Sequence, residues 1–186
     1  MIITISGTPC SGKSTIGKGT AEKLGYKFYS IGDIMKKLAD EKGLSLMEFS
    51  KKAEKDKKID AYLDEELKKL AKQENDSVIT TRTGCHLIPE SIKIFVKCDL
   101  DITAGRLLKD VKEEKRKTES EIKTKEDALK LVKKRLESEK KRYKKYYGIN
   151  YLAEENYDFI IDTTGLTPEE SVKRVMNFII EKISTS

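Results

Sequence analysis

Short apolar runs alternate with longer stretches of mixed polarity along the chain. Five of these runs are rich in β-branched residues and have the length of single strands: 2–6, 27–30, 77–81, 93–98 and 158–162. The longer stretches between them have helical patterns. Strands that alternate with helices predict a parallel sheet covered by helices, so the expected fold class is α/β with five strands.

Local signals predict where several helices begin and end. Glycine is a typical stop, so Gly25 is expected to end a helix over 14–24 and Gly43 a helix over 33–42. Two capping boxes and one proline in a first helical turn mark helix starts: Ser45 with Glu48, Thr167 with Glu170, and Pro168.

Residues 7–14 match the pattern G-x-x-x-x-G-K-[ST] of phosphate-binding loops and directly follow the first apolar run. The glycines let the backbone form a nest of N–H donors around phosphate groups. Lys13 can reach the β and γ phosphates of a nucleoside triphosphate, and the Ser14 hydroxyl can ligate Mg2+. The alternative is a glycine-rich turn from strand to helix that binds nothing.

Two helical intervals, 33–76 and 106–157, are too long to be plain crossovers between neighbouring strands. Ligands of open parallel sheets bind beyond the carboxyl ends of the strands, where the phosphate-binding loop already points. Both intervals are therefore expected to flank one cleft. Such a cleft encloses a second substrate and keeps water away from a phosphoryl group in transfer.

A chain of 186 residues has the size of one domain and needs no disulfide or metal to fold. Its three cysteines, Cys10, Cys85 and Cys98, are odd in number and lack metal-ligand spacing, which suits a reducing compartment. The first apolar run is too short for a signal peptide or a membrane span. We therefore expect a cytoplasmic protein with no membrane partner.

Positive charge is concentrated in one part of the chain. The net charge is +6, and residues 106–147 contain 17 lysines and arginines against 9 aspartates and glutamates. Aromatic residues do not interleave with them over most of this segment, which argues against nucleic-acid binding. We expect the segment to draw phosphates into the cleft; the alternative is a solvated helix face.

Five segments together resemble one known family. They are the loop 7–14, Ser30-Ile-Gly-Asp33-Ile34, the segment 43–49, Lys141-Arg-Tyr143 with Tyr147-Gly-Ile149, and Ile161-Asp-Thr-Thr164. Across nearly the whole chain the sequence resembles the short, archaeal-type cytidylate kinases of the nucleoside monophosphate kinase family. The resemblance implies a P-loop NTPase-type five-stranded parallel sheet flanked by helices, in a single domain of residues 1–186. Its parts would be a core (1–32, 77–105 and 150–186), a helical monophosphate-binding flap (33–76) and a helical lid (106–149).

The resemblance also implies an activity. The γ-phosphoryl group of ATP would pass to the 5′-phosphate of CMP or dCMP, giving CDP or dCDP and ADP, with Mg2+ as cofactor. This chemistry needs charge neutralisation and alignment more than a general base, because the acceptor phosphate is already anionic. We expect a monomer whose partners are ATP and the monophosphate.

Two other functions stay open at the level of the sequence. The same frame could phosphorylate another nucleoside monophosphate or a different small molecule. The chain could also be a P-loop ATPase that regulates the binding of RNA or another polyanion. The absence of an obvious Walker-B carboxylate at Thr80-Thr81 argues against this second alternative.

By the resemblance, the phosphate-binding loop and one arginine hold the donor nucleotide. Arg106 would stack on the donor base through its planar guanidinium. Ser14 and Asp33 are the expected metal-site residues, and Asp33 would orient Mg2+-bound water. The alternative for Asp33 is an N-cap for the helix 34–42. The expected cofactor-binding residues are Gly7, Thr8, Pro9, Cys10, Ser11, Gly12, Lys13, Ser14, Thr15 and Arg106.

The expected catalytic residues are Lys13, Arg135 and Arg142. Arg135 and Arg142 are seven residues apart, so a helix presents both on one face. They match lid arginines that contact the transferring phosphoryl group in the family, and a guanidinium suits that role because it is always charged and makes forked bonds to phosphate. The alternative is that both are ordinary exposed arginines. The expected acceptor-binding residues are Ser30, Asp33, Lys36, Asp60 and Arg82, of which Ser30, Asp60 and Arg82, together with Asp64, would read the base.

Three positions depart from the family's pattern. Lys36 stands where the family has arginine, and Asp110 stands where many relatives place another arginine. Thr81 stands where an acidic residue usually precedes Arg82. These departures leave the identity of the acceptor base open.

Overall fold

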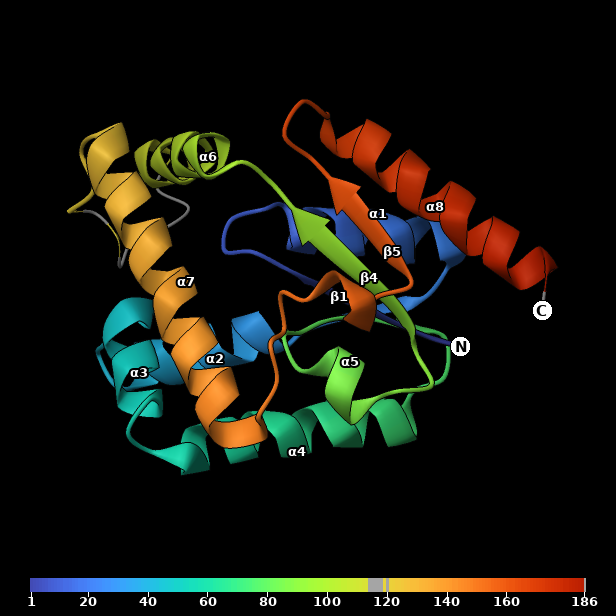
Figure 1. Ribbon diagram of the computed structural model, residues 1–186, viewed down its shortest axis with the longest axis horizontal. Coiled ribbons are helices and arrows are strands. Elements are labelled where there is room, and N and C mark those ends of the chain that lie inside the picture. The colour runs from blue at the N-terminus through green and yellow to red at the C-terminus, as the bar shows by residue number, and fades with distance from the viewer. Residues whose placement is uncertain (114–118, 120, 186) are drawn as a thin grey trace.

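The computed structural model describes residues 1–113, 119 and 121–185. Its centre is a sheet of five strands in the order β2-β3-β1-β4-β5, in which all neighbouring strands are parallel (Figure 1). The five predicted strands are confirmed, each end within one residue of its expected position. They are β1 (Ile2–Gly7), β2 (Lys27–Ser30), β3 (Ser77–Thr80), β4 (Ile92–Lys97) and β5 (Phe159–Asp162).

Helices cover both faces of the sheet, because successive residues of a strand point to opposite faces and the central strands are buried on both. On one face, Ile3 and Ile5 of β1 pack against α1 (Lys13–Leu24) and α8 (Pro168–Ser184). On the other face, Ile79 of β3 packs against the helices that follow β2. The β1 and β3 ends that carry the functional loops are therefore held rigidly between two apolar layers.

Among the described residues, three α-helices lie between β2 and β3, and two lie between β4 and β5. Those after β2 are α2 (Ile31–Glu41), α3 (Leu46–Ala53) and α4 (Lys57–Gln73). Those after β4 are α6 (Leu100–Lys112) and the long α7 (Lys125–Tyr147). The short α5 (Gly84–Leu87) and the 3-10 helix η2 (Glu154–Asn156) complete the described elements. Helix α7 packs on α6 at its start and reaches across to α3 at its other end (Figure 1).

The division into core, flap and lid stays a prediction. Helices α3 and α4 lie in the interval 33–76 expected for the flap, α2 begins two residues before it at Ile31, and α7 lies in the interval expected for the lid. Helix α6 runs through the expected boundary between core and lid at residue 106. Part of the expected lid, residues 114–118 and 120, lies outside the described residues.

Most helix ends follow the local signals. Gly25 ends α1 in a left-handed conformation with φ 68°, which glycine adopts without a Cβ penalty. Both predicted capping boxes are present, at the starts of α3 and α8, and Pro168 occupies the first turn of α8. Gly43 follows the end of α2 with φ 63°.

The start of α2 differs from the expectation. The helix begins at Ile31 with Ser30 as its N-cap, and the Asp33 N–H donates to the Ser30 hydroxyl at 3.1 Å. The alternative that Asp33 caps a helix over 34–42 is therefore wrong. Serine and aspartate both cap helices well, and here the cap three residues earlier adds one more turn to the helix. The Asp33 carboxylate is thereby left in the first turn, where it complements the helix dipole.

Among the described residues, no helix combines the length and the apolar character that a bilayer span requires. The 23-residue α7 is the longest of them, and lysine, arginine and glutamate recur along it. This helix packs on α6 and on α3, so its length spans the distance between them.

The capping box of α8 provides a test of the fold. Replacing Thr167 with alanine removes the hydroxyl that accepts from the Glu170 N–H at 3.2 Å. We expect a loss of about 1 kcal/mol in the free energy of unfolding, measured by urea denaturation. Thr167→Ser keeps the oxygen and is the control. Equal stability of the two variants would contradict the capping role.

Candidate active site

A cleft of about 630 Å³ opens beyond the carboxyl ends of β1 and β3. Its walls come from the phosphate-binding loop, from α2 and α4, and from α6 and α7. The predicted site residues all line it except Gly7 and Thr8, which pack against β4 at the base of the loop. The predicted site residues that line the cleft are Pro9, Cys10, Ser11, Gly12, Lys13, Ser14, Thr15, Ser30, Asp33, Lys36, Asp60, Arg82, Arg106, Arg135 and Arg142.

The phosphate-binding loop has backbone conformations that few side chains tolerate. A Cβ on Gly7 would lie 2.2 Å from the carbonyl oxygen of Val96, so only glycine fits there. Gly12 has φ 92° and Cys10 has φ 59°, both left-handed. The hydroxyls of Thr8 and Ser11 are buried without a hydrogen-bond partner among the described residues. These are features of a loop shaped to receive a polar ligand.

The start of α1 is open to an anion. No side chain caps it, and no acidic residue lies in its first turn. The first N–H groups of a helix have no partner within the helix and carry the positive end of its dipole. An uncapped start after a glycine loop is therefore a site for phosphate.

Lys13, the first residue of α1, adds a half-buried positive charge to this start. Burial lowers the pKa of its ammonium group well below the ordinary value, and the nearby Arg82 lowers it further, whereas Glu139 raises it. Arg135 also acts on Lys13 as a like charge. Several cations thus share one cleft, and an anion bound there would relieve their mutual repulsion.

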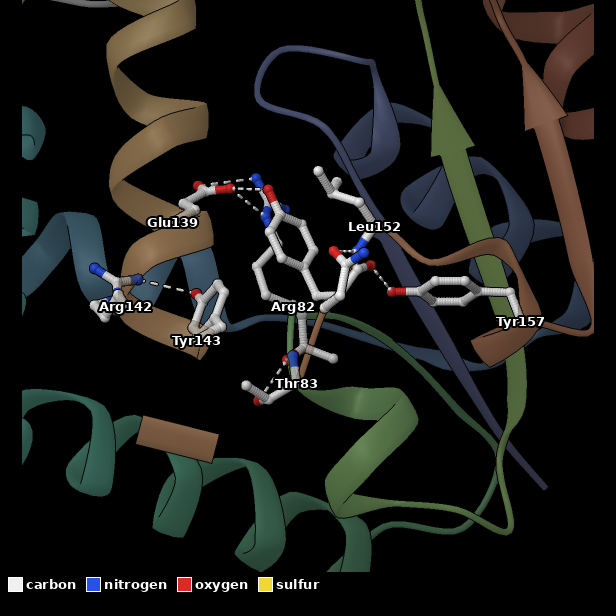
Figure 2. Close-up of polar contacts among 10 residues, drawn as sticks. Arg82, Thr83, Glu139, Arg142, Tyr143, Leu152 and Tyr157 are labelled. Carbon is white, nitrogen blue, oxygen red and sulfur yellow. Dashed lines mark hydrogen bonds and ion pairs between the residues drawn. The ribbon is translucent and has the colours of Figure 1, made fainter. Parts of the chain in front are cut away.

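Arg82 and Glu139 form a partly buried ion pair in the cleft wall (Figure 2). The Arg82 Nε donates to Glu139 Oε2 at 2.8 Å and Nη2 donates to Oε1 at 3.2 Å. Tyr151 also donates its hydroxyl to Glu139 Oε2, at 2.7 Å. The sequence analysis missed Glu139. A signal was available, because Glu139 lies four residues after Arg135 and three before Arg142, on the same face of one helix.

Arg142 is buried, with 2% of its surface exposed. Its Nη2 donates to the Tyr143 hydroxyl at 2.9 Å (Figure 2). Its Nε lies 3.2 Å from Asp60 Oδ2, close enough for an ion pair but without hydrogen-bond geometry. Its Nη1 has no hydrogen-bond partner among the described residues. A buried guanidinium with unused donors in a cleft wall is poised to bind an oxyanion.

Further contacts seat the second half of α7 on α3 and α4. Tyr147 donates to Asp64 Oδ2 at 2.5 Å, and Tyr146 donates to the carbonyl oxygen of Ala53 at 2.8 Å. Ser138 donates to the carboxylate of Glu54. The cleft is therefore closed on one side by contacts between the segments expected to be lid and flap.

Arg106 braces the phosphate-binding loop. Its guanidinium donates to the carbonyl oxygens of Ser11 at 3.3 Å and Thr163 at 2.8 Å. The Thr163 hydroxyl, which Arg106 also contacts at 3.1 Å, donates to the same Ser11 oxygen at 3.0 Å. The sequence analysis did not foresee this contact, although it singled out the segment that contains Thr163.

The remaining arginine of the cleft, Arg135, pairs with Glu119 at 3.3 Å. Lys36 and Asp33 reach the cleft from the first two turns of α2, where Ser30 caps the helix. The predicted cations therefore converge on the cleft from five separate parts of the chain: α1, α2, the segment after β3, α6 and α7.

Asp60 is expected to make the protein less stable as the pH rises from about 4 to about 6. Burial raises the pKa of its carboxyl group from the ordinary 3.8 to about 6, against the opposing effect of Arg142. In that window the folded state binds more protons than the unfolded chain, so stability falls with rising pH. We would measure the unfolding free energy of the parent minus that of Asp60→Asn from pH 4 to 7. The difference should decrease up to about pH 6 and then level off; an increase over this range would contradict the assignment.

Residues 2–165 match the model of the Cytidylate kinase-like family. The cytidylate kinase of Methanothrix thermoacetophila is 38% identical over 163 residues, which cover 88% of each chain. The cytidylate kinase of Sulfurisphaera tokodaii is 34% identical over 187 residues, which cover 98% of each chain.

Solved kinase structures share the architecture. A shikimate kinase from Bacteroides thetaiotaomicron matches with a TM-score of 0.64 at 17% identity, over 96% of this chain and 98% of that chain. Another, from Acinetobacter baumannii, matches with a TM-score of 0.59 at 13% identity, over 97% and 93%. At these identities the likeness shows the P-loop kinase fold alone. The family match and the relatives above 30% identity show that the chain belongs to the cytidylate kinase-like family.

Proposed function

We propose that this protein transfers the γ-phosphoryl group of ATP to the 5′-phosphate of CMP, forming CDP and ADP. One observation carries the proposal: the buried Arg142, with unused donors, lines the same cleft as the uncapped start of α1. Two separate anion sites in one cleft are what transfer between two phosphates requires. The names of the relatives supply the base of the acceptor. We extend the proposal to dCMP as a second acceptor.

On the donor side, residues 7–15 would hold the ATP phosphates through backbone N–H groups, with Lys13 on the β and γ phosphates. Arg106 holds the loop through the Ser11 carbonyl oxygen and lies at the cleft wall, where its plane can also stack on the adenine. One side chain would thereby serve both the shape of the loop and the position of the nucleotide.

The residues present fit a magnesium ion. Ser14 and Asp33 both line the cleft. Among the described residues there is no cluster of three or more histidine, cysteine or acidic side chains that could hold a metal unaided. Mg2+ keeps several waters and phosphate oxygens, so one or two protein oxygens are enough. Bound there, the ion would neutralise charge on the phosphates. Ser14 would contribute its hydroxyl, and Asp33 would orient the bound water.

On the acceptor side, Arg82 and Lys36 would bind the CMP phosphate, with Ser30 and Asp60 near the nucleoside. Arg142 and Arg135 would contact the γ-phosphoryl group in flight. An acceptor oxygen forms a bond to the γ-phosphorus as the bond to the β-phosphate bridging oxygen breaks, and ADP leaves with the electron pair. No proton has to move, so the arginines act by holding charge and alignment.

We assign residues 33–76 to a flap and 106–149 to a lid around the core. The contacts of α7 with α3 and α4 support this division, because they close the cleft without the sheet taking part. Closure matters because water would otherwise accept the γ-phosphoryl group and turn the kinase into an ATPase.

An acceptor panel tests the function. ADP formation from MgATP would be measured with CMP, dCMP, UMP, AMP, GMP and shikimate, each against a blank without acceptor. We expect CMP and dCMP to give the highest kcat/KM and the blank to be slow. A higher kcat/KM with another acceptor would show that this acceptor, and not CMP, is the preferred substrate. Hydrolysis that no acceptor stimulates would refute the kinase proposal.

A further inference from the structure

We propose that Glu139 is a positioning residue that holds the Arg82 guanidinium in the cleft only while α7 is seated. The inference rests on the proposed phosphoryl transfer, in which Arg82 binds the acceptor phosphate. It goes further, because it makes the order of the acceptor site depend on the lid helix.

The geometry of the pair is that of a fixed fork. Arg82 offers Nε and Nη2 to the two oxygens of Glu139, at 2.8 and 3.2 Å. Forked pairs fix the plane of the guanidinium as well as its distance. The fork uses two of the five N–H donors, so the remainder can serve a phosphate in the cleft that Arg82 lines.

Glu139 is itself held in place. The Tyr151 hydroxyl donates to Oε2 at 2.7 Å, and the Tyr151 ring lies 5.7 Å from the Arg82 guanidinium carbon. Tyr151 is almost completely buried and packs edge-on against Tyr143. The carboxylate thus has a fixed partner on one side and Arg82 on the other, which restricts both side chains to one arrangement.

Glu139 also balances charge between the two substrate sites. Burial by itself would raise the pKa of its carboxyl group, but Arg82 and Lys13 lower it to about 2. The group is therefore charged at neutral pH. It lies among cations of the acceptor side and the donor side, and it reduces their repulsion when no phosphate is bound.

The dependence on the lid follows from where the two partners come from. Arg82 follows β3 in the core, whereas Glu139 lies on α7, which reaches the flap through Tyr146 and Tyr147. Any movement of α7 away from the flap separates Arg82 from the carboxylate. Without Glu139, the Arg82 side chain regains rotation about several bonds. The acceptor phosphate would then be held less accurately, and misplacement of a reacting group by about 1 Å can lower the rate of transfer a hundredfold.

Glu139→Gln tests the inference, with Glu137→Gln as the matched control. Glu137 lies on the same helix, pairs with Lys140 and has a side chain that is 60% exposed. We expect Glu139→Gln to lower kcat/KM for CMP about 10- to 100-fold and to leave the dissociation constant of MgATP within about twofold. The 1H–15N resonance of Arg82 Nε should shift in this variant. Glu137→Gln should match the parent in all three measurements.

A double-mutant cycle with Arg82→Lys separates positioning from other roles. If Glu139 acts through Arg82, Glu139→Gln adds almost nothing once Arg82 is lysine. Additive losses, parental kcat/KM in Glu139→Gln, or an unmoved Arg82 resonance would overturn the inference. If Glu139→Gln fails to fold, Glu139→Asp, which keeps the charge one methylene shorter, should show the same losses in smaller measure, and full activity would count against the proposal.

The two proposals fail in different ways. If the parent protein has no activity on CMP, the proposed function is refuted. The shift of the Arg82 Nε resonance in Glu139→Gln still tests the pairing of Glu139 with Arg82 in that case. A parent active on CMP whose Glu139→Gln variant is equally active refutes the positioning role alone.

Discussion

Replacing Lys13 with methionine is expected to lower the rate of transfer from ATP to CMP by about a thousandfold or more, while the protein stays folded. The ammonium group supplies a fixed charge to the phosphates in a buried site, where electrostatic stabilisation of the transition state is strong. Burial lowers its pKa well below the ordinary value, so its charge costs stability when no ligand is present. Methionine should therefore preserve or raise the unfolding temperature. CDP formation and thermal unfolding would be measured side by side.

Lys18→Met is the matched control for this prediction. Lys18 lies on the same helix, is exposed, stands 5.8 Å from the centroid of the Phe28 ring and is not among the residues that line the cleft. It should keep the parental rate. Substantial turnover in Lys13→Met would contradict the donor-site assignment, and so would an equal loss in both variants.

Replacing Arg142 with alanine is expected to lower kcat about 100- to 1000-fold with little change in the affinity for ATP. The unused Nη1 and the poorly aligned Nε can bind fully only when an oxyanion lies between the two substrates. Such a contact strengthens in the transition state, so its loss appears in kcat. Single-turnover rates and ATP titrations would be measured on the same preparations.

The substitution also leaves Asp60 buried without its partner, which destabilises the protein whatever the chemistry. The double variant Arg142→Ala/Asp60→Asn removes both charges and should fold more stably while remaining as slow. Lys141→Ala, at the exposed neighbouring position of α7, should behave as the parent does. An effect of Arg142→Ala confined to KM would exclude the transition-state role.

These two predictions address opposite sides of one cleft. Lys13 belongs to a local motif whose spacing defines its position. Arg142 belongs to a helix that is held at the cleft by tertiary packing on α6 and α3 and by the contacts of Arg142 and Tyr147 with α4. Loss of activity in both variants would tie the phosphate-binding loop and α7 to a single reaction.

The sheet could be predicted from the sequence because its signals are local. Runs such as Lys93–Cys98 are buried strands by composition and length, and the alternation with helices leaves a parallel sheet as the consistent arrangement. The capping boxes at Ser45 and Thr167 are signals within four residues. The start of α2 could not be predicted in the same way. Ser30 and Asp33 are both good N-cap residues, so the local sequence does not decide which of them caps the helix.

The cleft residues could be named from the phosphate-binding motif and the family resemblance, but their partners could not. Glu139 meets Arg82 over 57 positions of sequence, and Arg106 meets Ser11 over 95. No local pattern encodes which carboxylate reaches which guanidinium, since that depends on how α7 packs on the rest of the fold. The charged residues of the cleft could be predicted from the sequence. Their hydrogen-bond and ion-pair partners could be identified only from the folded structure.

The central claim is that this cleft passes a phosphoryl group from one nucleotide to another and excludes water. Phosphorus NMR of the protein with MgATP and CMP tests it most directly, because each phosphorus atom is followed to its product. Loss of the ATP γ signal should be matched by growth of the CDP β signal, with little inorganic phosphate. Growth of inorganic phosphate without CDP would contradict it.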